Sequence, residues 1–173
     1  MNKKKKEEKH WYAFYTKSRA EKKVYDRIDN LGFEVFLPLV TTVRQWSDRK
    51  KKVKIPLIRS YIFVRTKQKK IIDILQVPGI VRVLKYLGKP AIVKDYEIEN
   101  LKILVRQGQN VKKIKDISEL EIGAEIEIAQ GPLKGLRGKC VSFRGNKSIV
   151  VEISSLGEFF QVTVPAEQIK VCK

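Results

Sequence analysis

The hydrophobic pattern of the chain changes near residue 120, and this change restricts the folds that it can adopt. Before that point, short strand-forming runs alternate with segments in which apolar residues recur at helical spacing. After it, short strand-forming runs are separated by glycine-containing turns. Because a chain of 173 residues suits one large or two small domains, we predict an α+β domain followed by a small all-β domain.

The predicted boundary lies in a polar segment between the two patterns. Gln107–Asn110 is polar, and residues 111–119 alternate in charge with few large apolar side chains, which is typical of a linker. The predicted division is a basic disordered tail at 1–9, a first domain at 10–106, a linker at 107–120 and a second domain at 121–173.

Positive charge is concentrated in the first domain. The chain has 37 lysines and arginines against 19 aspartates and glutamates, a formal net charge of +18. Residues 121–173 contain seven basic and six acidic residues, so nearly all of the excess lies before them. An excess of this size indicates a polyanionic partner, most often nucleic acid.

Several classes of protein are disfavoured by the sequence. Cys140 and Cys172 show no CxxC spacing and the only histidine is His10, so we expect neither a metal site nor a disulfide framework. No nucleophile-and-base motif or phosphate-cradling glycine loop is present, so we expect no enzymatic activity, no catalytic residues and no cofactor. The basic start lacks an apolar stretch, and no run approaches the roughly 18 apolar residues of a membrane span, so we expect a cytoplasmic protein that binds no membrane.

The first domain opens with a strand and a helix. Trp11–Tyr15 is apolar on both faces, which is typical of a central strand. Ser18–Glu21 fits a capping box, in which the serine and glutamate side chains bind backbone N–H groups at a helix start. The helix that follows has an apolar stripe and a basic side, and should end at Gly32. The stripe consists of Ala20, Val24, Ile28 and Leu31, and the basic side of Arg19, Lys22, Lys23 and Arg27.

The remaining elements of this domain complete a β-α-β-β-α-β order with an extra helix, which is typical of a ferredoxin-like α+β sandwich. Two of the strands form a hairpin with a strongly basic tip over residues 47–52. The predicted strands are 33–37, 41–46, 53–55, 60–65 and 80–84, and the predicted helices are a short one over 71–75 and a last one beginning near Asp95.

The second domain is predicted to form five strands within about 50 residues, which favours a small barrel. The strands are expected at 125–129, 140–143, 148–153, 159–164 and 169–171. Gly131, Gly135 and Gly138 lie between them, and we interpret all three as structural, because turns require positive φ or close backbone approach.

Both domains resemble parts of one known family. Residues 123–138 match the G-x-x-[IV]-x-[IV]-x-x-G-P-[LF]-x-G-[LF]-x-G string of a KOW motif, which occurs in SH3-like barrels of transcription factors and ribosomal proteins. Three upstream segments resemble the NGN domain of NusG-type transcription elongation factors: WYAFYTKSRAEKKV, PLIRSYIFV and VPGIVRVL. The resemblance covers nearly the whole chain from Trp11 onward. It implies a ferredoxin-like NGN domain followed by a five-stranded SH3-like KOW barrel.

The resemblance also implies a polymerase-binding surface. In the family, the NGN domain binds the clamp helices of the largest RNA polymerase subunit through an apolar surface and suppresses pausing. Carried over to this sequence, the polymerase-binding residues are Tyr15, Ile58, Tyr61 and Phe63. Ile58 stands where the family commonly has phenylalanine, within IRSY in place of F-P-G-Y or F-P-N-Y. Core packing is the alternative for the aromatic residues, because strand aromatics usually point inward.

Nucleic-acid contacts are implied at two groups of basic residues. The family's contacts to the non-template DNA strand fall on Lys17, Arg19, Lys23 and Arg27. The basic hairpin adds Arg44, Arg49 and Lys50, for which plain solvent exposure is the alternative. Neutralising phosphates with such side chains gives salt-dependent affinity by counterion release.

The predicted function is that of a monomeric transcription elongation or antitermination factor, associated with the nucleoid during transcription. The departure at IRSY and the basic patch favour a specialised paralogue that resembles the RfaH- and UpxY-like antiterminators of capsular or exopolysaccharide operons. A housekeeping NusG is the first alternative, and the KOW barrel would then couple transcription to Rho or to a small-subunit ribosomal protein. A ribosome-associated KOW RNA-binding protein is the second, which the near-neutral charge of residues 121–173 disfavours.

Overall fold

The computed structural model describes residues 8–45, 49–107, 111–114, 121–143, 146–163 and 169–171. The chain divides into two compact units. One consists of Met1–Pro38 and Pro56–Asp95, and the other of Leu39–Ile55 and Tyr96–Lys173. Most of the predicted tail at 1–9 lies outside the described residues.

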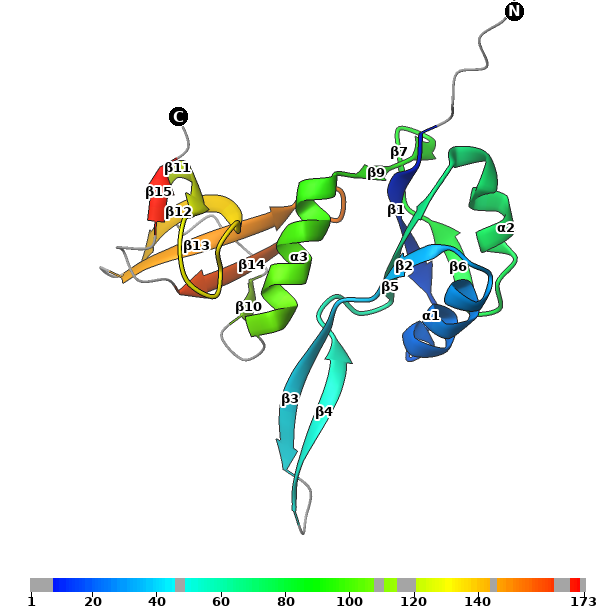
Figure 1. Ribbon diagram of the computed structural model, residues 1–173, viewed down its shortest axis with the longest axis horizontal. Coiled ribbons are helices and arrows are strands. Elements are labelled where there is room, and N and C mark those ends of the chain that lie inside the picture. Colours follow the sequence, from blue (N-terminus) through cyan, green and yellow to red (C-terminus); the bar gives the residue numbers. More distant parts are fainter. Residues whose placement is uncertain are drawn as a thin grey trace, which may run out of the picture. The chain divides into compact units, whose positions relative to one another are not determined.

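The first unit is built on an antiparallel sheet with the order β2-β5-β1-β6, and a short strand, β9, also pairs with β1 (Figure 1). Helix α1 follows β1, and α2 follows β5 after a 3-10 turn, η1. This connectivity and strand order confirm the predicted ferredoxin-like arrangement. The bounds are β1 His10–Thr16, α1 Glu21–Asn30, β2 Glu34–Phe36, β5 Tyr61–Thr66, η1 Gln68–Lys70, α2 Ile71–Leu75, β6 Ile80–Val83 and β9 Ile92–Val93.

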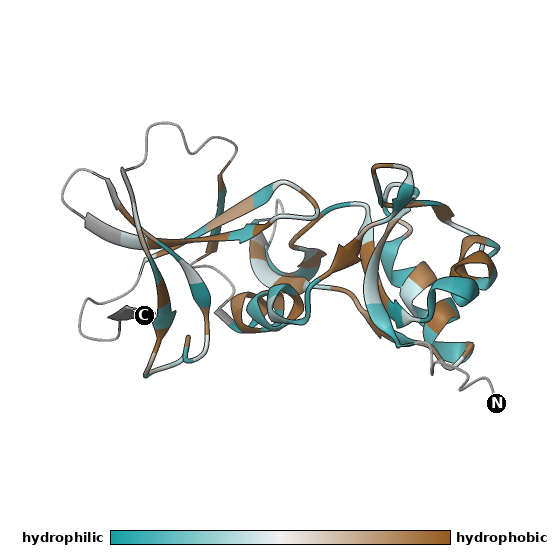
Figure 2. Ribbon diagram, turned by 90° about the horizontal axis from the view of Figure 1, so that it is seen from above, coloured by the Kyte–Doolittle hydropathy of each residue, from teal (hydrophilic) through white to brown (hydrophobic). Residues whose placement is uncertain are grey.

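Strand β1 is the centre of this unit, as its apolar sequence predicts. Side chains on successive strand residues point to opposite faces, so a run that is buried throughout lies inside a covered sheet. Trp11, Tyr12, Ala13 and Phe14 are all buried. In α1 the stripe residues Val24 and Ile28 are fully buried, and the coiled ribbons in Figure 2 alternate between hydrophilic teal and hydrophobic brown.

Two details of α1 correct the sequence-based prediction. Leu31 is 59% exposed, because the helix ends at Asn30 and turns away at Gly32, whose φ is +77°. The predicted capping box does not form: the N-cap is Ala20, and no side chain caps the helix. Arg19 has a φ of +62°, so the chain enters the helix two residues later than a cap at Ser18 requires.

Two small hairpins complete the described strands up to residue 95. β3 (Leu39–Gln45) and β4 (Lys50–Pro56) form a two-stranded sheet of their own, which confirms the predicted hairpin. Trp46–Asp48, part of its predicted tip, lie outside the described residues. β7 (Lys85–Tyr86) and β8 (Lys89–Pro90) form the second hairpin.

The second unit contains helix α3 and an antiparallel sheet with the order β10-β14-β13-β12-β11-β15. This strand-rich sheet is consistent with the predicted KOW barrel. The sheet gains β10 from the predicted linker, because Val111 and Ile114 pair with Val162 and Phe159 of β14. The bounds are α3 Asp95–Gln107, β10 Val111–Ile114, β11 Glu121–Ile128, β12 Arg137–Phe143, β13 Asn146–Ile153, β14 Glu158–Thr163 and β15 Ile169–Val171.

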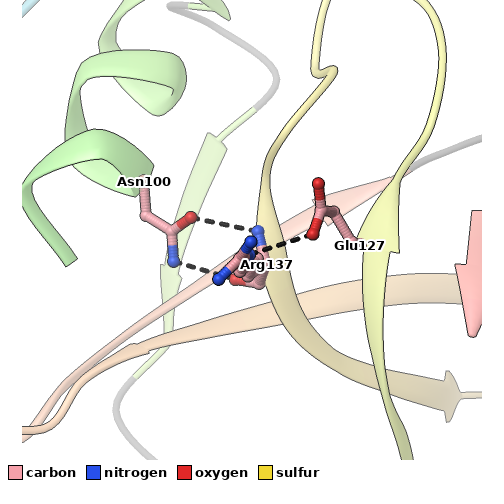
Figure 3. Close-up of polar contacts among 3 residues, drawn as sticks. All are labelled: Asn100, Glu127 and Arg137. Carbon is pink, nitrogen blue, oxygen red and sulfur yellow. Dashed lines mark hydrogen bonds and ion pairs between the residues drawn. The ribbon is translucent and has the colours of Figure 1, made fainter. Parts of the chain in front are cut away.

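Polar side chains of α3 form hydrogen bonds with the rest of this unit. The sequence pattern had assigned residues through 106 to the first domain. The Asn100 side chain donates to the Arg137 carbonyl at 2.9 Å and accepts from the Arg137 N–H at 3.0 Å (Figure 3). The Ser154 N–H donates to the Glu97 carboxylate at 2.7 Å. Both helix side chains are buried, so each would leave unsatisfied groups if the helix were removed.

The three predicted structural glycines occupy positions that a side chain would strain or block. Gly131 and Gly135 have φ angles of +80° and +85°. A Cβ added to Gly138 would lie 2.5 Å from the Val150 carbonyl oxygen and 2.7 Å from a methyl carbon of Ile149. Glycine is therefore required at position 138 for space, and at positions 131 and 135 for backbone conformation.

Replacing Gly138 by alanine should destabilise the C-terminal unit by about 2–3 kcal/mol, because the backbone oxygen that meets the new methyl group cannot move without breaking the sheet. Gly157→Ala is the matched control. Its φ is +63° but nothing lies within 4 Å, so only the conformational strain of about 1 kcal/mol applies. Chemical denaturation of the two variants measures the difference. Equal losses would contradict the steric explanation.

Replacing Leu87 by asparagine should stabilise the first unit by about 1 kcal/mol, because Leu87 holds a φ of +49° that asparagine tolerates better in a two-residue hairpin turn. Leu87 is 85% exposed, so no packing is lost. Leu31→Asn removes another exposed leucine at a φ of −81° and should leave thermal stability nearly unchanged. A lower melting temperature for Leu87→Asn would refute the interpretation.

Candidate functional site

Three turns of the first unit meet at the end of β1. The Thr16 N–H donates to the Ser60 carbonyl at 2.8 Å, and the Lys17 N–H donates to the Gly79 carbonyl at 2.8 Å. These bonds join the turn before α1 to the turn before β5 on one side and to the turn before β6 on the other. The three turns therefore form one continuous surface.

Two side chains of α1 hold the neighbouring turns in place. The Ser60 N–H donates to the carboxylate of Glu21 at 2.9 Å, and Glu21 is 6% exposed. The Arg27 guanidinium donates to the Pro78 carbonyl. Gly79 has a φ of +102°, and a Cβ there would lie 2.7 Å from a methyl carbon of Val24, so only glycine lets this turn approach the helix.

An aromatic row lies across the sheet beside these turns. Tyr15 pairs with Tyr61 on β5 and with Arg82 on β6, so the three side chains share one face. The two rings meet edge-to-face, with centroids 5.4 Å apart and an interplanar angle of 75°. Arg82 places its guanidinium carbon 5.3 Å from the centroid of Tyr15, within the range of a cation–π interaction. Both tyrosines are only half-buried, so this row is accessible from solvent.

Ile58 and Phe63 do not share this surface, although the resemblance assigned them to it. They are 1% and 0% exposed, so neither side chain reaches a partner in this conformation. Phe63 lies opposite Ala13, the smallest side chain of β1, and its ring centroid is 6.2 Å from that of Phe36. For Phe63 the structure therefore favours core packing.

The basic residues implied by the resemblance gather at the same end of the sheet. Lys17, Arg19 and Lys23 are exposed, and Arg27 is exposed while it donates to Pro78. Sequence reasoning missed two further exposed arginines, Arg59 and Arg82. Strand alternation could have indicated Arg82. It lies two residues after Ile80 in a strand beside β1, and alternate residues of a strand point to the same face. We call these exposed residues the cationic end: Lys17, Arg19, Lys23, Arg27, Arg59 and Arg82.

The predicted hairpin residues belong to a separate element. Arg49 and Lys50 are exposed at the start of β4. Arg44 lies in β3, and its side chain is outside the described part of the structure.

A shifted pKa is found outside the cationic end. Burial raises the pKa of Tyr12, which lies on the opposite face of β1 from Tyr15 and outside this surface. Within the described ranges, no group of three or more His, Cys, Asp or Glu side chains could hold a metal ion. In the same ranges, no helix is both long enough and apolar enough to span a membrane.

Comparisons with known proteins agree on one family. The family model described as NusG, transcription termination factor nusG, matches residues 9–102. A search of curated proteins gave no match. NusG of Thermotoga maritima, solved in a study of its domain interaction, is similar in structure, with a TM-score of 0.51, 23% identity and coverage of 95% of this chain and 98% of that one.

Two structures of the MjSpt4:Spt5 complex also match along most of the chain. Conformation A has a TM-score of 0.32 and 16% identity, and covers 94% of this chain and 98% of that one. Conformation B has a TM-score of 0.34 and 19% identity, and covers 94% and 97%.

The likeness to the Thermotoga structure supports the fold alone, because the sequences are less than a quarter identical. The family model carries the assignment. It spans more than half of the chain, and it contains all three turns and the aromatic row. The chain belongs to the NusG family of transcription factors.

Proposed function

We propose that this NusG-family chain is a transcription elongation factor that binds RNA polymerase through the Tyr15–Tyr61 row and the displaced non-template DNA strand through the cationic end. The family has a general role in transcription elongation, and its members bind RNA polymerase. One observation carries the proposal for this chain: half-buried aromatic rings and exposed cations meet at one end of one sheet.

The aromatic row suits a protein partner. Tyrosine and arginine are enriched among the residues that contribute most to protein interfaces, because they bury large areas with few rotatable bonds. Tyr15 and Tyr61 hold each other through edge-to-face contact, and Arg82 packs on the first ring, so the row loses little conformational freedom on binding. A helix pair such as the polymerase clamp could pack its apolar side on these rings.

The cationic end suits a single nucleic-acid strand. Proteins that bind single strands combine a basic groove with aromatic rings on which bases stack. The carboxylate of Glu21, at the start of α1, is buried and accepts the Ser60 N–H, so it is engaged with the turn before β5. Backbone bonds fix the turns, which keeps the cations at constant spacing.

A specialised role in antitermination, as in capsular or exopolysaccharide operons, is part of the proposal. The burial of Ile58 weakens one argument for it, because the unusual isoleucine changes the core and not the contact surface. The excess of exposed cations remains in its favour. We further propose that the protein is a cytoplasmic monomer, and that its C-terminal sheet recruits Rho or a small-subunit ribosomal protein.

Replacing both Tyr15 and Tyr61 by alanine should weaken binding to core RNA polymerase at least tenfold, because truncating a pair of interface aromatics removes about 2 kcal/mol or more. Biolayer interferometry at moderate salt measures the affinity. Tyr86→Ala is the control, since Tyr86 is 73% exposed in the same unit but away from the row. Unchanged affinity of the double variant would refute the polymerase surface. Binding to ribosomal subunits in place of polymerase would favour the ribosome-associated alternative.

Replacing Lys17 and Lys23 by glutamate should reduce read-through of pause and termination sites in a reconstituted elongation assay, while the chain still binds polymerase. Charge reversal removes two phosphate contacts and should lower the salt slope for single-stranded DNA by about 1.4 or more. Arg27 is left in place because it holds Pro78. Lys85→Glu with Lys89→Glu, on β7 and β8, is the matched control, because both residues are exposed and the net charge changes equally. Read-through equal to that of the control would show that the cationic end has no role.

A further inference from the structure

Strand β10 closes one end of the C-terminal sheet. It has four residues, Val111–Ile114, and among the described strands it pairs with β14 alone (Figure 1). Without β10, β14 would be the last strand in the row and would present unpaired backbone N–H and C=O groups. An open edge of this kind can pair with an extended segment of another protein. β10 therefore occupies a position that a strand from a partner could take.

Few side-chain contacts hold β10 in this position. Its two apolar residues, Val111 and Ile114, are only half-buried, and Lys112 and Lys113 are exposed. Lys113 forms an ion pair with Glu158 of β14 at 2.6 Å, but the two side chains retain 44% and 22% exposure. Such a pair adds little to stability, because water and salt screen it. We therefore expect β10 to detach more readily than strands that are paired on both sides.

A side chain of β14 also indicates an apolar contact at this edge. Phe160 and Val162 are buried, and alternation along the strand places Phe159 on the opposite face, away from that core. Phe159 is half-buried, and Ile114 of β10 lies opposite it in the register. Core packing does not explain an outward phenylalanine beside a sheet edge. Contact with the strand that occupies the edge does explain it.

We propose that β10 is a removable edge strand, and that its departure opens β14 to an extended segment of a partner protein. The contacts of β10 define the pattern of that segment: apolar residues opposite Val162 and Phe159, and a basic residue that reaches Glu158. Backbone hydrogen bonds supply the affinity in strand addition, and side chains supply the specificity. This surface goes beyond the proposed function, because it requires neither RNA polymerase nor nucleic acid.

A labelled peptide with the sequence of residues 109–116 is the probe, because it copies the strand that fits the edge. In the wild-type chain, β10 competes with the peptide at high effective concentration. Val111→Asp with Ile114→Asp removes both apolar contacts of β10 and leaves β14 intact. Fluorescence anisotropy should show at least tenfold tighter binding of the peptide to this full-length variant than to the wild type. Equal binding to both, or binding to neither, would overturn the proposal.

Two controls test whether the peptide binds at the edge. Lys112→Asp changes the net charge by the same two units as the double variant, but it alters an exposed residue. The Lys112→Asp chain should bind the peptide as weakly as the wild type does. A peptide with asparagine in place of Val111 and Ile114 keeps its charge and should not bind the double variant. Tight binding in either control would show attraction by charge alone and overturn the proposal.

Hydrogen–deuterium exchange of the wild-type chain tests the departure of β10 without any substitution. When β10 leaves, β14 loses its neighbour on one side, whereas β12 stays paired with β11 and β13. The amides of residues 111–114, and those of β14 that bond to them, should exchange at least tenfold faster than the amides of β12. If both groups exchange as slowly as β12, β10 does not leave by itself and the proposal is wrong.

Discussion

The hydrogen bond to the buried carboxylate of Glu21 is the contact on which the proposed binding surface of the N-terminal unit depends. The carboxylate accepts the N–H of Ser60, a residue held at a φ of +59°, and so fixes the turn that leads into β5. A hydrogen bond to a charged group contributes about 1.5–3 kcal/mol, and its loss would leave a buried charge unpaired. Together with the bond from Arg27 to Pro78, it makes α1 the support for turns on both sides of β1.

This support keeps the proposed binding surface rigid. The aromatic row lies on strands, and the cations lie on turns that backbone hydrogen bonds join to those strands. Sites held on regular elements lose less entropy on binding than sites on free loops. The family-matched region therefore combines a rigid apolar contact with fixed positive charges. The β3–β4 ribbon differs from it, because it presents charge on an element without a core.

The sequence predicted the elements better than their contacts. The apolar run at 11–15 identified the central strand, and the glycine spacing identified the turns of the C-terminal sheet, because both depend on local pattern. The capping box failed because Glu21 makes a tertiary bond to Ser60 instead of a local one. Tyr61 is half-buried and Phe63 is fully buried, although both lie on one face of the same strand. The difference depends on what lies opposite each ring, which strand alternation does not encode. For α3, the pattern gave an apolar face but could not indicate the sheet that Asn100 and Glu97 bind.

Hydrogen–deuterium exchange of the full chain, free and saturated with core RNA polymerase, tests the central claim most directly. The account predicts slower exchange on binding in the three joined turns and the strand ends beside them, namely residues 15–20, 57–61 and 78–82. Protection confined to other segments, with these three exchanging as in the free protein, would contradict it.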